Sequence, residues 1–274
     1  MSLGNATRSE FTKQFTTVGW WVIGVILVAY LLMFAVGMGA AVGASASGSI
    51  PGGQPIPLPA DQVAPWIYSL AASSGYVLPL LFGTLMVTSE FRHKLIVPTL
   101  LANPRRGVVL SSKLIVGVIM GAIYGVVAIA STIGGGAGML AVFGQETALG
   151  STGTWAMAGR VVLALILWTL VGIGVGSVIR NQVAAIVVVL AFTQFVEPVI
   201  RMAGMFVDQL REPLQYLPGA ASDALVGQSL LAIAGTGDAA SDTPAWWVGA
   251  LVLAGYAVLL TVIGTFTTWR RDID

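Results

Sequence analysis

Long apolar stretches separated by polar segments run through this sequence. Crossing about 30 Å of hydrocarbon takes about 20 helical residues at about 1.5 Å each. Six stretches of about that length carry few or no charges, and they lie at residues 20–42, 66–87, 114–133, 161–179, 183–203 and 246–269. An open strand edge in lipid would leave backbone groups without hydrogen bonds, so each stretch is predicted to be helical. The pattern predicts an all-α polytopic membrane protein with six transmembrane helices in a single domain, residues 1–274.

The segment before the first stretch is polar but has an apolar face. Within residues 1–19, Phe11, Phe15 and Val18 follow i, i+4, i+7 spacing. This spacing predicts an interfacial helix that leads into the first span like an elbow. An ordinary solvated tail is the alternative.

Two further features bear on where the spans end. Residues 204–245 form the longest segment on the outer side, with short helices expected at 206–217 and 220–231 on either side of Pro218-Gly219. The run Gly134-Gly135-Gly136 is expected to end or bend the third span.

Composition narrows the class of protein. Hydrophobic residues make up 56% of the chain and charged residues 9%, which is far more apolar surface than a soluble core buries. There is no cysteine and one histidine, His93, so no thiolate or histidine metal site is expected. A net charge of +1 is too small to attract nucleic acid electrostatically, so no nucleic-acid partner is expected.

The basic residues are distributed unevenly between the two sides. If the N-terminus is cytoplasmic, the inner side holds Arg8, Lys13, Arg92, Lys94, Arg105, Arg106, Lys113, Arg180, Arg270 and Arg271. Only Arg160, Arg201 and Arg211 then lie outside. The positive-inside rule predicts that both termini lie in the cytoplasm. We expect a multi-pass protein of the plasma membrane.

Residues 88–113, between the second and third stretches, combine charge with apolar side chains. They carry five of the thirteen basic residues, too many for hydrocarbon, so the segment is predicted to be cytoplasmic. An apolar stripe compatible with short helices consists of Phe91, Leu95, Ile96, Leu100 and Leu101. Such a surface could dock a soluble partner, although positive-inside charge without a docking role is the alternative.

Several short motifs occur together and in order. They are R-S-E-F-T-K at 8–13, T-S-E-F-R-H-K at 88–94, L-L-A-N-P-R-R at 100–106, G-I-G-V-G-S-V-I-R-N-Q at 172–182, V-E-P-V-I at 196–200 and Y-L-P-G-A-A-S-D-A-L at 216–225. In this combination the chain resembles the permease subunits of ABC-2 type transporters from actinobacteria. The motifs are individually short and degenerate, and their joint order is more specific.

The resemblance implies a six-span half-transporter that pairs with a second permease subunit, a homodimer more readily than a heterodimer. Two ATP-binding cassette subunits would drive it, and export would be the direction. It also implies that 88–113 forms the coupling helix that seats in the ATP-binding subunit. The coupling residues would be Glu90, Phe91, Arg92, Lys94, Arg105 and Arg106.

The sequence itself agrees with a separate ATPase. A P-loop requires Gly-Lys, and none of Lys13, Lys94 and Lys113 follows a glycine. We therefore expect no cofactor and no enzymatic site on this chain, with ATP and Mg²⁺ on the partner subunit.

Glycines recur every four residues in two of the spans. Gly117, Gly121 and Gly125 lie in one, and Gly172 and Gly176 in another. This spacing is typical of helix faces that approach one another closely in membranes.

The fifth stretch alone contains charges, Glu197 and Arg201, four residues apart. The spacing predicts a mutually neutralising pair, and a proton or substrate site is the alternative. Further candidates for an apolar pathway, suited to an amphipathic or lipid-like substrate, are Phe34, Tyr76, Phe192 and Phe195.

Two other functional classes stay open at this point. One is a secondary transporter or channel without an ATPase, and the other is a membrane scaffold or sensor that transports nothing. A membrane enzyme is disfavoured because the spans contain no paired carboxylates and no nucleophile–base constellation.

Overall fold

The structure is a computed structural model of the chain, and it describes residues 2–46, 59–102, 105–204, 206–228 and 244–269. Almost all of these residues are helical, and none of them forms a strand. The helices are α1 (Leu3–Thr16), α2 (Gly19–Ala46), α3 (Ala60–Ser73), α4 (Val77–Arg92), α5 (Ile96–Ala102), α6 (Arg106–Val142), α7 (Thr152–Val178), α8 (Gln182–Ala191), the π-helix η1 (Phe192–Val196), α9 (Glu197–Ala203), α10 (Asp208–Leu214), α11 (Pro218–Val226), α13 (Trp246–Gly264) and the π-helix η3 (Thr265–Trp269).

The six predicted spans are confirmed as helices long and apolar enough to cross a membrane. They are Gly19–Ala46, Asp61–Arg92, Arg106–Val142, Thr152–Val178, Gln182–Ala203 and Trp246–Thr267. Together they make the chain a multi-pass membrane protein.

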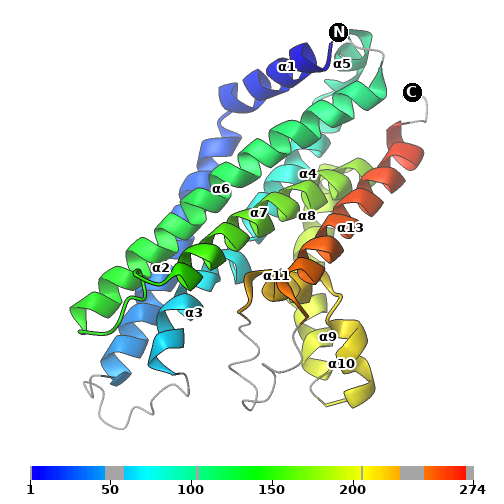
Figure 1. Cartoon of the computed structure of the whole chain (residues 1–274). Coiled ribbons are helices and arrows are strands. Elements are labelled where there is room, and N and C mark those ends of the chain that lie inside the picture. Colours follow the sequence, from blue (N-terminus) through cyan, green and yellow to red (C-terminus); the bar gives the residue numbers. More distant parts are fainter. Residues whose placement is uncertain (1, 47–58, 103–104, 205, 229–243, 270–274) are drawn as a thin grey trace.

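Helix α7 lies at the centre of the bundle and packs against α4, α6 and α13 (Figure 1). Helix α2 packs along α6, and α1 lies against the beginning of α6 at the end of the bundle where η3 also finishes. The fully buried side chains include Trp168 of α7 and Tyr124 of α6. By contrast, α2, α8 and α13 expose many apolar side chains, as expected of a surface that faces lipid.

The second span is two helices rather than one. α3 and α4 are separated by a turn at Ser74, Gly75 and Tyr76. Pro79, the third residue of α4, has no N–H to donate to the Gly75 carbonyl, which explains why the α-helical ladder is interrupted there.

The fifth span, like the second, is interrupted along its length. The π-helix η1 interrupts it between α8 and α9, and Pro198 follows directly at the start of α9. Pro198 lacks the N–H that would continue an α-helical ladder, so the local widening to a π-helix falls one turn before it.

Gly134-Gly135-Gly136 does not end the third span, because α6 continues as a helix to Val142. Unlike proline, glycine keeps its backbone N–H and can continue a helical hydrogen-bond ladder. At these positions its lack of a side chain lets neighbouring helices pack closely. A Cβ on Gly135 would meet side chains of α2 at 3.2–3.3 Å, and one on Gly136 would meet Ile67 of α3 at 2.6 Å. At 37 residues α6 is about 55 Å long, so it extends well beyond about 30 Å of hydrocarbon.

The glycines of the other close-packed faces lie at helix crossings. Gly121 and Gly125 of α6 face Ile166 and Val162 of α7, where an added Cβ would lie 2.7 and 2.8 Å from their Cα atoms. A Cβ on Gly117 would overlap Ile173 of α7. On its other side α7 meets α4: Gly172 faces the backbone oxygen of Leu80, and Gly176 faces that of Thr84.

Two short helices, α10 and α11, follow the fifth span. Pro218 begins α11 as its first residue, where its missing N–H costs nothing, so Pro218-Gly219 starts the second helix rather than separating the two. α11 is largely buried and packs against α13, α7 and α3. The helix expected over 220–231 ends earlier, at Val226, where Gly227 adopts the left-handed conformation that closes a helix.

Candidate functional site

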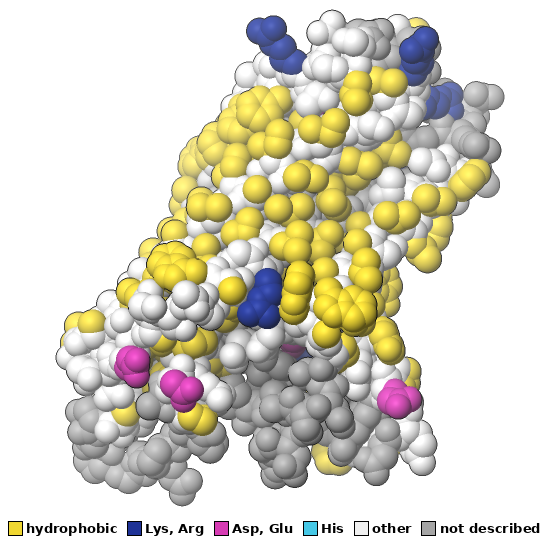
Figure 2. Space-filling model, in the orientation of Figure 1, with side chains coloured by type: hydrophobic (Ala, Val, Ile, Leu, Met, Phe, Trp, Pro, Cys, Tyr) yellow, Lys and Arg dark blue, Asp and Glu magenta, His cyan; other side chains and the backbone are white. Residues whose placement is uncertain are grey.

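Charge separates the two ends of the molecule. Figure 2 shows Lys and Arg gathered mainly at the end that holds α1 and α5, and acidic side chains near the opposite end. Apolar side chains cover most of the surface between them. We call these the basic end and the acidic end.

Four charged side chains meet inside the basic end, and we call them the charge cluster: Glu10, Lys13, Glu90 and Lys113. The Lys113 Nζ lies 2.9 Å from Glu10 Oε2 and 2.9 Å from Glu90 Oε1. The Lys13 Nζ lies 2.8 Å from Glu10 Oε1 and 3.1 Å from Glu90 Oε1. Each ammonium group therefore bridges both carboxylates, and the two positive and two negative charges balance.

Four helices contribute to this contact. α1 supplies Glu10 and Lys13 from one face, three residues apart, while α4 and α6 supply Glu90 and Lys113. The Lys13 Nζ also donates to the Thr99 Oγ1 of α5 at 3.3 Å. The Lys113 side chain is 0% exposed, and Glu90 Oε2 is buried with no hydrogen-bond partner within the described part of the chain. The cluster thus joins α1, α4, α5 and α6 where they come together.

The opposite charges within the cluster change the pKa values of the two α1 residues. Burial raises the pKa of Glu10, but the charges of Lys113 and Lys13 outweigh it and hold the pKa below the ordinary 4.5. Burial likewise lowers the pKa of Lys13, but its hydrogen bond and attraction to Glu10, and its attraction to Glu90, leave it above 10.5.

We expect acid to loosen the basic end through Glu10. A carboxyl with a depressed folded-state pKa contributes stability above its unfolded value of 4.5, and this contribution is lost as pH falls through the folded value. The contribution of Lys13 is complete below 10.5 and is lost only above that pH. The melting temperature of the purified chain should therefore fall more steeply below pH 4.5 than that of Glu10→Gln. Equal slopes for the two proteins would contradict the assignment to Glu10.

The residues predicted to couple to a partner differ in how far they are exposed. Glu90 was expected at a docking surface, but it is buried and held by two lysines, so it acts inside the chain and not on its surface. Phe91 is half-buried and packs against the core. Arg92 and Lys94 are exposed, and Arg92 donates to the Gln182 Oε1 at 3.4 Å. Arg105 and Arg106 flank the start of α6.

The cluster was not predicted from the sequence, although a signal for it exists. Glu10 and Glu90 occupy the centres of two identical Ser-Glu-Phe triplets, at residues 9–11 and 89–91. Lys113 stands at the edge of a long apolar run, where a lysine needs an acidic partner or water.

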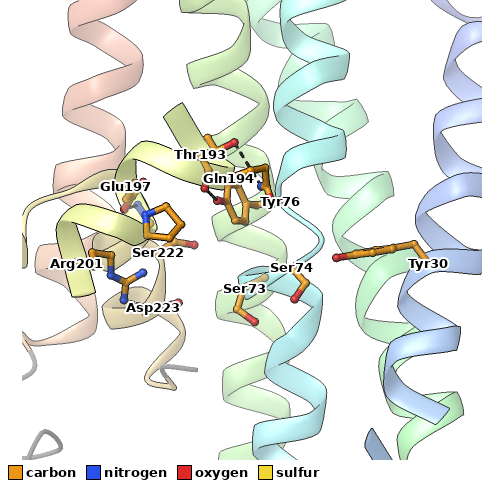
Figure 3. A pocket seen from close by; sticks show the side chains of 13 residues that line it. Tyr30, Ser73, Ser74, Tyr76, Thr193, Gln194, Glu197, Arg201, Ser222 and Asp223 are labelled. Atoms are coloured by element: carbon orange, nitrogen blue, oxygen red, sulfur yellow. Dashed lines mark hydrogen bonds and ion pairs between the residues drawn. The ribbon is translucent and has the colours of Figure 1, made fainter. Parts of the chain in front are cut away.

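A second polar site lies in the half of the bundle nearer the acidic end. It is a cavity of about 210 Å³ beside the two helix interruptions (Figure 3). The residues that line it are Tyr30, Ala72, Ser73, Ser74, Tyr76, Thr193, Gln194, Glu197, Pro198, Arg201, Gly219, Ser222 and Asp223. They come from α2, α3, the α3–α4 turn, η1, α9 and α11.

The Glu197–Arg201 pair expected from their spacing is replaced by two separate contacts. Glu197 Oε1 accepts from the backbone N–H groups of Gly219 at 2.6 Å and Ala220 at 3.2 Å, at the beginning of α11. The Arg201 Nη2 lies 2.6 Å from Asp223 Oδ2. The reason is that α11 folds back against α9 and offers each side chain a closer partner than its neighbour one turn away.

Contacts with Trp168 and Thr193 hold the aromatic side chain of Tyr76, which lines the cavity. Tyr76 stacks on Trp168 with ring centroids 4.4 Å apart, and its hydroxyl donates to the Thr193 carbonyl at 3.3 Å. That carbonyl lies in η1, so the contact joins the two interrupted spans. The Trp168 Nε1 donates in turn to the Ser222 Oγ of α11 at 3.1 Å.

The cavity gathers some of the predicted pathway residues and leaves out others. Tyr76, Glu197 and Arg201 line it, whereas Phe34, Phe192 and Phe195 do not. Phe34 and Phe195 are exposed on the outer surface of the bundle. Sequence reasoning missed Asp223 and the polar residues around the α3–α4 turn, because only the fold brings them beside the fifth span.

The sequence matches no model of a known protein family, and it has no significant match among curated proteins. Within the described residues, no group of three or more His, Asp or Glu side chains could hold a metal ion.

Taken together, the geometry provides two polar sites joined by one helix. α4 begins directly after Tyr76 at the cavity and ends two residues beyond Glu90 in the cluster. A 16-residue helix is about 24 Å long, so α4 spans the distance between the cluster and the cavity without interruption.

Proposed function

We propose that this chain is the membrane-spanning subunit of an ATP-driven transporter of the ABC-2 type that its motifs resemble. The observation that carries the proposal is the charge cluster, together with α4, which leads from it to the cavity. The cluster fixes α1 and α5 to the spanning helices, so a force on the basic end passes directly into α4 and α6.

The basic end is the cytoplasmic end in this proposal, and both termini lie there. The concentration of Lys and Arg supports this orientation through the positive-inside rule. α5 is the coupling helix, and its Leu101, with 80% of its surface exposed, is the apolar contact to the ATP-binding subunit. Arg92 and Lys94 flank that contact as the charged rim.

Two copies of the chain pair within the lipid, and two ATP-binding subunits supply ATP and Mg²⁺. Closure of these subunits moves α5 and α1, and the cluster passes the movement to α4. The α3–α4 turn and η1 are interruptions at which a span can bend without breaking a regular ladder. The polar cavity between them then opens and closes, and export of an amphipathic molecule follows.

The first experiment is purification of the tagged full chain from membranes of its own host, followed by measurement of Mg-ATP hydrolysis. We expect a P-loop subunit in equal stoichiometry and vanadate-sensitive hydrolysis. Burial of a leucine contributes about 1.5–3 kcal/mol, so Leu101→Ser should weaken the association by about tenfold or more. Val142→Ser, an exposed apolar residue at the far end of α6, is the matched control and should leave it unchanged.

The main alternative is a carrier or channel without an ATPase. It gains support if the purified chain transports at full rate in liposomes with no nucleotide and no P-loop subunit. That result would overturn the proposal, as would equal effects of Leu101→Ser and Val142→Ser.

A further inference from the structure

The charges that line the cavity do not balance. Arg201 and Asp223 satisfy one another at 2.6 Å, which leaves Glu197 as the third charged side chain. The positive group of the cavity is thus already committed to an acid. An anionic ligand would find no free cation among the lining residues, whereas a cation would find an acid.

Glu197 itself lacks one hydrogen-bond donor. Its side chain is held at Oε1 by two backbone N–H groups at the beginning of α11. Its Oε2 is buried and accepts no hydrogen bond from the described residues, and the residue is 2% exposed. A buried acceptor left unsatisfied is costly, so a donor supplied by a ligand would contribute more here than at the surface.

The remaining lining suits the body of a small organic cation. Tyr76 presents an aromatic ring that the stack on Trp168 holds in place, and the apolar part of a ligand can pack against such a ring. Figure 3 shows Tyr30 reaching from α2 toward Ser74, on the far side of the cavity from Glu197. The cavity therefore has a carboxylate at one end and an aromatic residue at the other.

Size restricts the ligand further. The cavity has a volume of about 210 Å³. Pockets for drug-sized ligands usually measure about 300–1,000 Å³. A single ring or a short chain fits, and a complete lipid does not.

We propose that this cavity binds a small organic ammonium ion, whose N–H donates to Glu197 Oε2 while its apolar part lies against Tyr76. The inference rests on the proposed function only in that the ligand is then a transported substrate or the cationic head of one. Binding itself requires neither ATP nor a partner.

The experiment is calorimetric titration of the full chain in lipid nanodiscs, without nucleotide, with empty nanodiscs as the blank. Three probes of nearly equal size are compared: benzylammonium, benzyl alcohol and benzoate. We expect saturable binding of benzylammonium at about millimolar concentration or below, at least about tenfold tighter than benzyl alcohol, and none of benzoate. This comparison needs no variant, so it does not depend on whether a mutant folds.

Two substitutions test the residues. Glu197→Gln keeps the shape and an acceptor for the α11 N–H groups, and it should weaken benzylammonium binding by about tenfold to a hundredfold. Glu212→Gln, the same change at an exposed glutamate outside the cavity lining, is the matched control and should change nothing. Asp223→Asn should also weaken binding, because Arg201 loses its partner and can turn to Glu197 one helical turn away.

Equal binding of benzyl alcohol and benzylammonium would overturn the proposal, as would preferential binding of benzoate or unchanged binding in Glu197→Gln. Failure of the proposed function is recognised separately. If no ATPase associates with the chain but benzylammonium binds as expected, the ligand site stands and the ATP-driven mechanism falls. If the ATPase associates and benzylammonium does not bind, the reverse holds.

Discussion

Lys113→Met is expected to lower the free energy of unfolding by about 3–5 kcal/mol, because it removes one partner of a buried ion cluster. The Lys113 side chain has no exposure, and its ammonium group lies 2.9 Å from each of two carboxylates. Methionine matches its length but leaves Glu10 and Glu90 with only the half-exposed Lys13 between them. Equilibrium unfolding in detergent, followed by circular dichroism, measures the loss.

Lys94→Met is the matched control for this substitution. Lys94 is exposed at the same basic end, so the same chemical change should alter stability by less than about 0.5 kcal/mol. A triple variant that adds Glu10→Gln and Glu90→Gln to Lys113→Met should recover part of the stability, since it no longer buries uncompensated charge. A loss in Lys113→Met no larger than in Lys94→Met would show that the cluster does not hold the helices together.

Gly172→Ala is expected to destabilise the bundle by about 3 kcal/mol, at the upper end of the usual cost of overpacking. A Cβ at this position of α7 would overlap the backbone carbonyl of Leu80 in α4. Across the same crossing, a Cβ on Gly83 would overlap the Thr169 carbonyl. Because the obstacle is backbone on both sides, no side chain can rotate away and the two helices must separate.

Gly159→Ala in the same helix is the control. No heavy atom lies within 4 Å of a Cβ at Gly159, so alanine adds helix propensity without a clash and should be neutral or stabilising by up to about 1 kcal/mol. Both variants are compared by unfolding in detergent. Similar stabilities would mean that α4 and α7 do not pack as closely as the structure shows.

The spans could be predicted because their cause is local. A helix must cover its own backbone groups and present apolar side chains to lipid, so the length of an apolar run decides whether it crosses. The ends were harder, as the third span shows. α6 continues past Gly134-Gly135-Gly136, where α2 packs against Gly135 and α3 against Gly136, and such contacts cannot be read from a single stretch of sequence.

The charge cluster could not be predicted by spacing along one helix. Lys13 meets Glu90 across 77 positions, and Lys113 meets Glu10 across 103. The sequence placed Glu90 and Lys113 in a cytoplasmic segment, with Glu90 among the residues expected to contact a partner. Burial of the cluster follows only when α1 folds against α6.

The same limit applies to Glu197 and Arg201. Their separation of four residues predicts a local pair, and in an isolated helix this is the only partner available. The fold adds α11, whose backbone N–H groups and Asp223 offer shorter contacts at 2.6 Å. Among the described residues, that competition leaves Glu197 Oε2 without a hydrogen-bond donor beside the cavity.

The sequence by itself determined that this protein lies in lipid, that it has six spanning helices and that basic residues concentrate at one end. Each of these features depends on residues close together in the chain. Tertiary structure decided which charges are buried, where the spans are interrupted side by side, and that a single helix connects the two polar sites. The physical reason is that burial and pairing depend on distances between helices, and these are set by packing across the whole bundle.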